Sequence, residues 1–153
     1  MRAKRSIWTV LAVGGCVGGM AWLSQPSQAQ TQSVEQQLEV MKTFNELFME
    51  QVKIGDSLFH GDAAVEEKMN VNLSDTGMAC AMCHPFASDT HPAQYPKWQE
   101  QMSQFAALRD MINWCIEKPN QGEKIDPDGP AMKALEAYIT WSNNNSPLAA
   151  GTH

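Results

Sequence analysis

The chain of 153 residues carries little charge, and this excludes several classes of protein. Only 18% of its residues are charged, and the sequence contains no acidic run, basic patch, internal repeat or sustained heptad pattern. These absences argue against a coiled coil, a disordered tail protein and a general nucleic-acid binder. Four cysteines are also too few for a disulfide-dense mini-scaffold. The length fits one domain, and 11 Lys+Arg against 17 Asp+Glu give a net charge of −6.

The first 29 residues have the layout of an export signal. Three positive charges precede residue 6, an apolar run extends from Ile7 to Leu23, and small residues stand at Ser27 and Ala29. This pattern is typical of a secretory signal peptide, so we expect cleavage near Ala29 and a periplasmic or otherwise exported protein. The apolar run is also just long enough to span a membrane, so an uncleaved N-terminal anchor is the alternative. A lipoprotein with a lipidated Cys16 fits more loosely.

Cleavage after Ala29 would change both the charge and the cysteine count. The mature chain would have 153 − 29 = 124 residues, with 11 − 3 = 8 basic against 17 acidic side chains, a net charge of −9. Three cysteines would remain, at positions 80, 83 and 115. An odd number of thiols in an exported protein indicates that they are used chemically.

The mature sequence predicts helices throughout. Apolar residues recur at steps of three and four from Val34 to Val52, which predicts an amphipathic helix over roughly Ser33 to Gly55 with a capping box at Ser33. Residues 56–94 lack a sustained period and indicate loops and short helical pieces. Further helices are expected to open at residues 96, 103 and 130, the second ending near 118 and the third at the asparagines 143–145. No stretch alternates with period two, so the expected class is all-α.

Residues 80–84 read Cys-Ala-Met-Cys-His, the C-x-x-C-H signature of covalent haem attachment. The thiols of Cys80 and Cys83 can form thioethers to the two vinyl groups of one haem, and His84 then presents its imidazole to the iron. A redox-active cysteine pair would need a βαβ context, which is absent. A zinc site would need a second pair of ligands, and only Cys115 is left. We therefore expect one covalently bound haem c.

The second axial ligand of the iron is open from the pattern alone. Cys115 falls on the apolar face of its helix and is far enough from His84 to approach from the other side. Methionine is the common choice in small c-type cytochromes. Met132 is the best placed methionine, although its position at the start of the last helix is typical of a core residue. His91 lies only seven residues after His84, too close along the chain to reach across.

Several segments resemble known cytochromes. Residues 55–59 look like the G-x-x-L-F segment that precedes the haem motif in class I cytochromes c. Residues 95–96, the I-N-x-C segment at 112–115 and the M-K-A-L-x-A-Y-I segment at 132–139 resemble the first haem domain of thiosulfate dehydrogenase and of its relative, the A-type cytochrome of the Sox system. The resemblance implies a small class I cytochrome c-like domain wrapped around one covalent haem, with an extra N-terminal helix. It also implies that His84 and Cys115 ligate the iron, with Met132 as the alternative to Cys115.

The sequence departs from these relatives in two respects. Residue 111 is methionine where the family often has arginine, with Arg109 two positions earlier, and only one C-x-x-C-H motif is present.

The expected division of the chain is a signal peptide at 1–29, an N-terminal helix at 30–54, a cytochrome c domain at 55–142 and a C-terminal tail at 143–153. The side chains expected to pack against the haem are Met82, Pro85, Tyr95, Trp114 and Tyr138.

Three functions are consistent with these features. The first is an exported monohaem electron carrier, alone or as the small electron-accepting subunit or partner of a periplasmic sulfur-compound dehydrogenase. Its acidic surface would dock on a basic patch of a redox protein. The second is a single-domain enzyme of the thiosulfate dehydrogenase type, which needs a basic pocket for an anion, with Lys97 and Arg109 as candidates. The third is a haem-based sensor or structural component of a complex. We expect no nucleic-acid partner, and a membrane only if the leader is retained.

Overall fold

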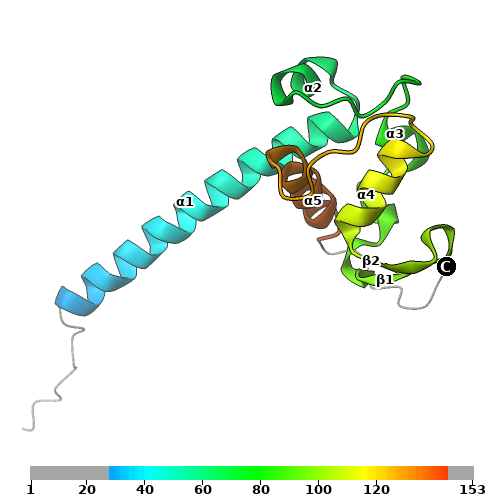
Figure 1. Cartoon of the computed structure of the whole chain (residues 1–153). Helices are drawn as coiled ribbons and strands as arrows, with labels where there is room; N and C mark the ends of the chain where they lie inside the picture. Colours follow the sequence, from blue (N-terminus) through cyan, green and yellow to red (C-terminus); the bar gives the residue numbers. More distant parts are fainter. Residues whose placement is uncertain (1–27, 145–153) are drawn as a thin grey trace, which may run out of the picture. The chain divides into compact units, whose positions relative to one another are not determined.

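The computed structural model describes residues 28–144 and is mainly helical, which confirms the expected class. The chain divides into two compact units, Met1–Gln36 and Gln37–His153. Residues 1–27 of the expected leader (1–29) and residues 145–153 of the expected tail (143–153) lie outside the described residues. No helix in the described part of the chain is long and apolar enough to cross a membrane. The elements are labelled in Figure 1: α1 Gln28–Phe59, α2 Ala63–Met69, α3 Cys80–Cys83, the 3₁₀ turns η1 Ala87–Thr90, η2 Pro92–Gln94 and η3 Glu100–Met102, β1 Lys97–Gln99, β2 Gln104–Ala106, α4 Leu108–Glu117 and α5 Pro130–Ser142.

Helix α1 extends beyond both expected ends. The helix already runs from Gln28, so Ser33 lies inside it rather than capping it, and it continues past Gly55 to Phe59. The chain then turns at Gly61, whose φ of 76° is a left-handed conformation that glycine adopts without steric cost. Gly55 does not end the helix. It lies inside α1, at the position where Ala134 and Tyr138 of α5 pack against the helix.

One face of α1 is covered by the domain at its C-terminal end and uncovered further upstream. Val52 and Phe59 are buried. Met41 and Phe48 lie on the same face, at steps of seven and four residues, yet are 67% and 42% exposed. The expected amphipathic pattern is therefore real, but only its last two turns contribute to the core of the domain. The large exposed apolar side chains in residues 37–48 are Leu38, Val40, Met41, Phe44, Leu47 and Phe48.

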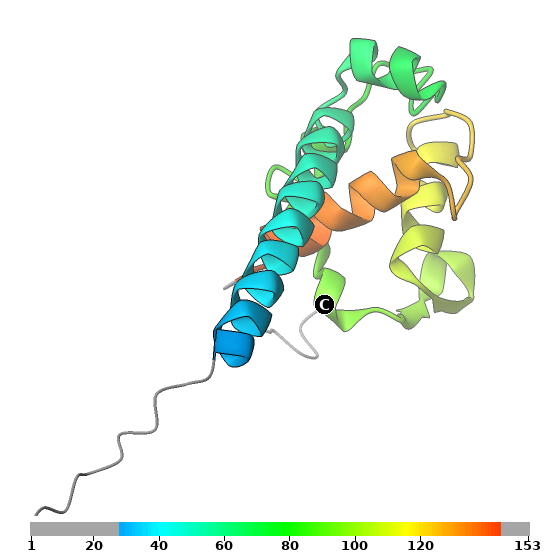
Figure 2. The same cartoon turned by 90° about the vertical axis from the view of Figure 1, so that its left-hand side faces the viewer.

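Helices α1 and α5 cross at Gly55, and Figure 2 shows the two ribbons passing close to each other. A Cβ atom added at Gly55 would overlap the Ala134 carbonyl oxygen and would lie 2.6 Å from the Ala134 carbonyl carbon and 2.7 Å from the Tyr138 Cβ. The Tyr138 ring then packs with its centre 5.3 Å from that of the Phe59 ring. The two helix backbones meet directly here, which only glycine permits.

The hydrophobic core lies between α5, α4 and the end of α1. Helix α5 begins with Pro130 in its first turn, as the sequence predicts, and is capped at Asn143. The most deeply buried large side chains are Leu58, Phe59, Ile116, Met132 and Leu135. Leu73, Ile112, Ile125 and Ile139 extend the cluster.

A short antiparallel hairpin replaces two of the expected helical segments. The predictions that helices open at Pro96 and Ser103 are wrong. Residues 97–99 and 104–106 instead pair as strands β1 and β2, with Trp98 opposite Phe105. Ser103 has φ of 51° at the turn between the strands rather than a helix cap. The Trp98 and Phe105 rings meet edge to face at 5.9 Å. Cross-strand aromatic pairing stabilises strands that are too short to show alternation in the sequence.

Helix α4 starts at Leu108 and is preceded by Ala107 at the cap position, four residues beyond the expected cap at Ser103. Its first turn is fixed by Asp110, whose carboxylate accepts a hydrogen bond of 2.8 Å from the Ala107 backbone N–H. This bond satisfies a donor that the helix itself leaves unpaired. The expected end near residue 118 agrees with the structure, where α4 ends at Glu117.

Candidate functional site

A cavity of about 230 Å³ brings together the parts of the chain that carry the thiols and imidazoles. Cys80 and His84 contribute from the haem-attachment motif, and Cys115 contributes from α4. The polar part of the lining comes from one stretch of the chain and consists of Asp89, Thr90, His91, Tyr95, Lys97 and Gln99. The apolar part of the lining comes from α1, α4 and α5 and consists of Phe59, Leu108, Met111, Ile112, Leu135 and Ile139.

The attachment motif forms a single helical turn. Cys80 begins α3 and Cys83 ends it, and the His84 backbone N–H donates a hydrogen bond of 2.9 Å to the Cys80 carbonyl oxygen. Cys80 is half-buried and Cys83 is exposed. His84, the first residue beyond the turn, is half-buried and lines the cavity. The turn therefore directs one thiol and the imidazole inward, and leaves the second thiol at the surface.

The Cys115 thiol lies close enough to the motif for their charges to interact. Burial raises the pKa of Cys115 to about 11, and the Coulomb interaction with Cys83 adds to the shift. Burial also raises the pKa of Cys80 to about 11, with Cys115 as the next contribution. The pKa of Tyr95 is raised to about 12, first by burial and then by Cys115. The motif and α4, which are distant in the sequence, thus share one electrostatic environment.

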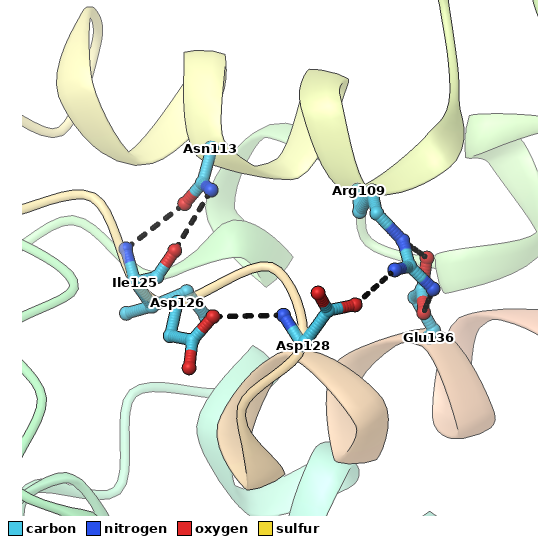
Figure 3. A network of polar contacts seen from close by, with 6 residues as sticks. All are labelled: Arg109, Asn113, Ile125, Asp126, Asp128 and Glu136. Carbon is cyan, nitrogen blue, oxygen red and sulfur yellow. Dashed lines mark hydrogen bonds and ion pairs between the residues drawn. The ribbon is translucent and has the colours of Figure 1, made fainter.

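Two polar contacts fix α4, and with it Cys115, against the rest of the domain (Figure 3). In the first, the Asn113 side chain donates a hydrogen bond of 2.9 Å to the Ile125 carbonyl oxygen and accepts one of 3.0 Å from the Ile125 backbone N–H. The paired geometry uses both the donor and the acceptor of one side-chain amide. Asn113 therefore stabilises the position of Cys115, two residues further along the helix.

Arg109 makes the second contact, an ion-pair network between α4 and α5. Its guanidinium donates to both carboxylate oxygens of Glu136 at 3.1 and 3.0 Å, and to Asp128 at 2.9 Å. A bidentate arginine–carboxylate pair is a strong, geometrically specific contact. Arg109 does not line the cavity, and its donors are directed to these carboxylates. Of the two cations considered for an anion pocket, only Lys97 lines the cavity.

The other residues singled out from the sequence are distributed more widely. Tyr95 lines the cavity. Met132 is completely buried in the hydrophobic core and is not part of the cavity lining. Tyr138 lies at the α1–α5 crossing, where burial and then a hydrogen bond with Asp56 raise its pKa to about 12. Met82 and Pro85 are exposed and Trp114 is half-buried, and none of the three lines the cavity.

The structure also places in the cavity residues that the sequence does not indicate. His91 lines the same cavity as His84, although its short distance along the chain argues against a role there. It reaches the cavity because residue 91 has φ of 51°, which sharply reverses the chain between η1 and η2. Gln99 lines the cavity because it shares a strand face with Lys97. Neither the turn at residue 91 nor the strand has a clear signal in the sequence.

The lining residues fit a haem by their chemistry. A covalently bound haem c needs two thiols, an axial imidazole and apolar walls for a flat macrocycle. Cys80 and His84 line the cavity and would supply one thiol and the imidazole, while the exposed Cys83, at the other end of the same helical turn, would supply the second thiol; the aliphatic and aromatic lining side chains are the walls. Cys115 adds a second possible axial donor at the same cavity. Thiolate is an established axial ligand of haem iron.

Comparison with known proteins agrees with this interpretation. The thiosulfate dehydrogenase of Psychrobacter arcticus is 23% identical over 77 residues, which cover 45% of this chain and 24% of that protein. The chain therefore spans about a quarter of the length of this relative. The family model of the SoxA/TsdA cytochrome c domain matches residues 66–148, more than half of the chain. The chain belongs to the SoxA/TsdA cytochrome c domain family, and a cytochrome c domain carries covalently bound haem c.

Proposed function

We propose that this chain is an exported monohaem c-type cytochrome that transfers electrons. The observation that carries the proposal is the shared cavity, in which the motif residues Cys80 and His84 meet Cys115 beside apolar walls. The bound haem supplies reversible one-electron chemistry between ferric and ferrous iron. The protein residues hold it, keep its surroundings largely apolar and set its potential. Because the matched relative is named for thiosulfate oxidation, sulfur metabolism is the proposed setting.

Each residue of the site has a proposed role. Cys80 and Cys83 form the thioether links, and His84 is one axial ligand. Cys115 is the second axial ligand, supported by its position in the cavity lining. Met132 is the alternative, but its complete burial in the core favours a packing role.

The surface charge supports docking to a basic redox partner. If residues 1–29 are removed, the mature chain has a net charge of −9, counted from 8 basic and 17 acidic side chains. Haem propionates would add further negative charge. A strongly acidic carrier associates fastest with a basic patch, and the association slows as salt is added. The proposed division keeps the leader at 1–29, the N-terminal helix at 30–54, the haem domain at 55–142 and the tail at 143–153.

The haem-free protein is expected to be poorly folded. The cavity removes packing partners from Phe59, Leu135 and Ile139, and a void in a core destabilises it by an amount that grows with the volume. We therefore expect the haem-free chain, prepared as the Cys80→Ala/Cys83→Ala variant, to show no cooperative melting transition by circular dichroism. The loaded wild type is the control. A native-like transition in the haem-free variant would contradict this expectation.

A single-domain enzyme acting on thiosulfate is the second candidate. It is favoured by the name of the matched relative and by Lys97, a cationic residue in the cavity lining. The engagement of Arg109 with Glu136 and Asp128 leaves such a pocket with one of its two expected cations.

A steady-state assay separates the two functions. The loaded protein, a dye acceptor and thiosulfate are mixed, and dye reduction is followed over many equivalents of protein. We expect no sustained turnover, while dithionite reduces the haem and an added oxidant reoxidises it. Turnover that depends on thiosulfate concentration would replace the carrier function with the enzymatic one.

A further inference from the structure

The ammonium group of Lys97 faces the cavity without a negative partner among the described residues. Its Nζ lies 3.4 Å from the Gln94 side-chain oxygen and 4.9 Å from the centre of the Tyr95 ring. Asp89 also lines the cavity, but the ion pairs in the described part of the chain involve other cations. Partial burial lowers the pKa of Lys97. A half-buried ammonium loses part of its hydration, and a charge in such a place is stabilised by pairing with an anion in addition to hydrogen bonds.

The Tyr95 hydroxyl is a second donor at the same wall. The Gln99 side-chain amide donates to the hydroxyl oxygen at 3.1 Å, so the hydroxyl proton remains for another acceptor. Tyr95, Lys97 and Gln99 all line the cavity. One positive charge and one O–H donor at neighbouring positions are a matching pair for a carboxylate or another oxyanion.

The hairpin holds this pair in place. Lys97 is paired with Ala106, which is completely buried, so the strand that carries the ammonium is anchored in the core. Trp98 points to the other face of the hairpin, where it packs on Phe105. Alternation along β1 therefore directs Lys97 and Gln99 to the cavity.

We propose that Lys97 and the Tyr95 hydroxyl form an oxyanion site in the wall of the cavity, which a carboxylate of the bound haem occupies. This inference rests on the proposed function, because it concerns the haem-loaded protein. A small free oxyanion has the same chemistry and is the other source of a ligand. In either case the fixed positive charge of Lys97 favours the ferrous state, which carries one positive charge fewer, and raises the reduction potential.

The test is the midpoint potential of loaded variants, measured by optical titration in chloride buffer. Lys97→Met keeps most of the side-chain length and removes the charge, so we expect its potential to fall below that of the wild type. Lys97→Arg keeps the charge and should restore the potential. Tyr95→Phe should shift it in the same direction as Lys97→Met by less. Lys133→Met, an exposed position on α5, is the matched control and should leave the potential unchanged.

Titration with sulfate identifies the ligand. If a haem carboxylate occupies the site, the wild-type potential is independent of sulfate while the Lys97→Met shift persists. If a free oxyanion occupies it, sulfate changes the wild-type potential saturably, and Lys97→Met abolishes this response. Equal potentials in wild type and Lys97→Met, with no response to sulfate, would overturn the site. A wild-type chain that attaches no haem would instead refute the proposed function, so the two failures are distinguishable.

Discussion

Replacing Cys115 by alanine is expected to raise the reduction potential of the loaded protein by on the order of 100 mV or more, because axial ligation is the strongest control of haem potential. A thiolate donates electron density and stabilises ferric iron, so its loss favours the ferrous state. The ferric absorption and electron paramagnetic resonance spectra should change together with the potential. Cys115 lines the cavity with His84, so the substitution acts on the proposed second ligand directly.

Two further variants make this result decisive. Met132→Leu nearly conserves volume at a completely buried position and should cost less than about 1.5 kcal/mol of stability, without changing the ferric spectrum. His91 lines the same cavity, and its imidazole can bind the iron in place of the missing thiolate. If it does so, the ferric spectrum of Cys115→Ala/His91→Ala should differ from that of Cys115→Ala. An unchanged ferric spectrum in both Cys115 variants, with a changed spectrum in Met132→Leu, would assign the ligand to methionine.

Replacing Gly55 by alanine is expected to lower the free energy of unfolding by about 3 kcal/mol or more, the upper range for forcing extra volume into a packed core. The sign is the informative part, since the same change inside an ordinary helix stabilises it by about 0.5 to 1 kcal/mol. Here the new methyl group would overlap the Ala134 carbonyl and lie 2.7 Å from the Tyr138 Cβ. The α1–α5 crossing must then separate.

Chemical denaturation of the loaded protein measures this effect. Gly77→Ala is the matched control, because a Cβ at that position meets nothing within 4 Å and carries only the cost of its left-handed φ of 75°. That cost is about 1 kcal/mol. A Gly55→Ala variant as stable as the wild type would show that the two helices do not touch at this residue.

Local signals in the sequence predict much of the site. The C-x-x-C-H motif forms its own helical turn, so its geometry follows from neighbouring residues alone. The spacing of apolar neighbours predicts that Cys115 lies on the apolar face of a helix, and the structure adds how that helix is held. Asn113 contributes most to this, since its two bonds to Ile125 explain why asparagine precedes the cysteine in the I-N-x-C segment.

The features that could not be predicted depend on contacts between distant residues. Gly55 looks like the end of a helix until Ala134 is known to lie against it. Trp98 and Phe105 fit a helix as well as a strand until their pairing across the hairpin is seen. Lys97 and His91 enter the cavity through that hairpin and through one left-handed residue, respectively. Their roles depend on tertiary structure, which overrides local preference at short segments.

The α1–α5 crossing joins two parts of the chain that are far apart in the sequence. The contact between Gly55 and Ala134 closes a loop of about eighty residues, and such a closure carries an entropy cost that neighbouring contacts do not. Synthesis proceeds from the N-terminus to the C-terminus. The complete Cys80–His84 segment is therefore present about fifty residues before Ala134 is added. The two thiols are therefore accessible on an open chain while the helices that later enclose the cavity are still apart. Cofactor attachment can precede the final long-range contact, which then closes the domain around a core that is already filled.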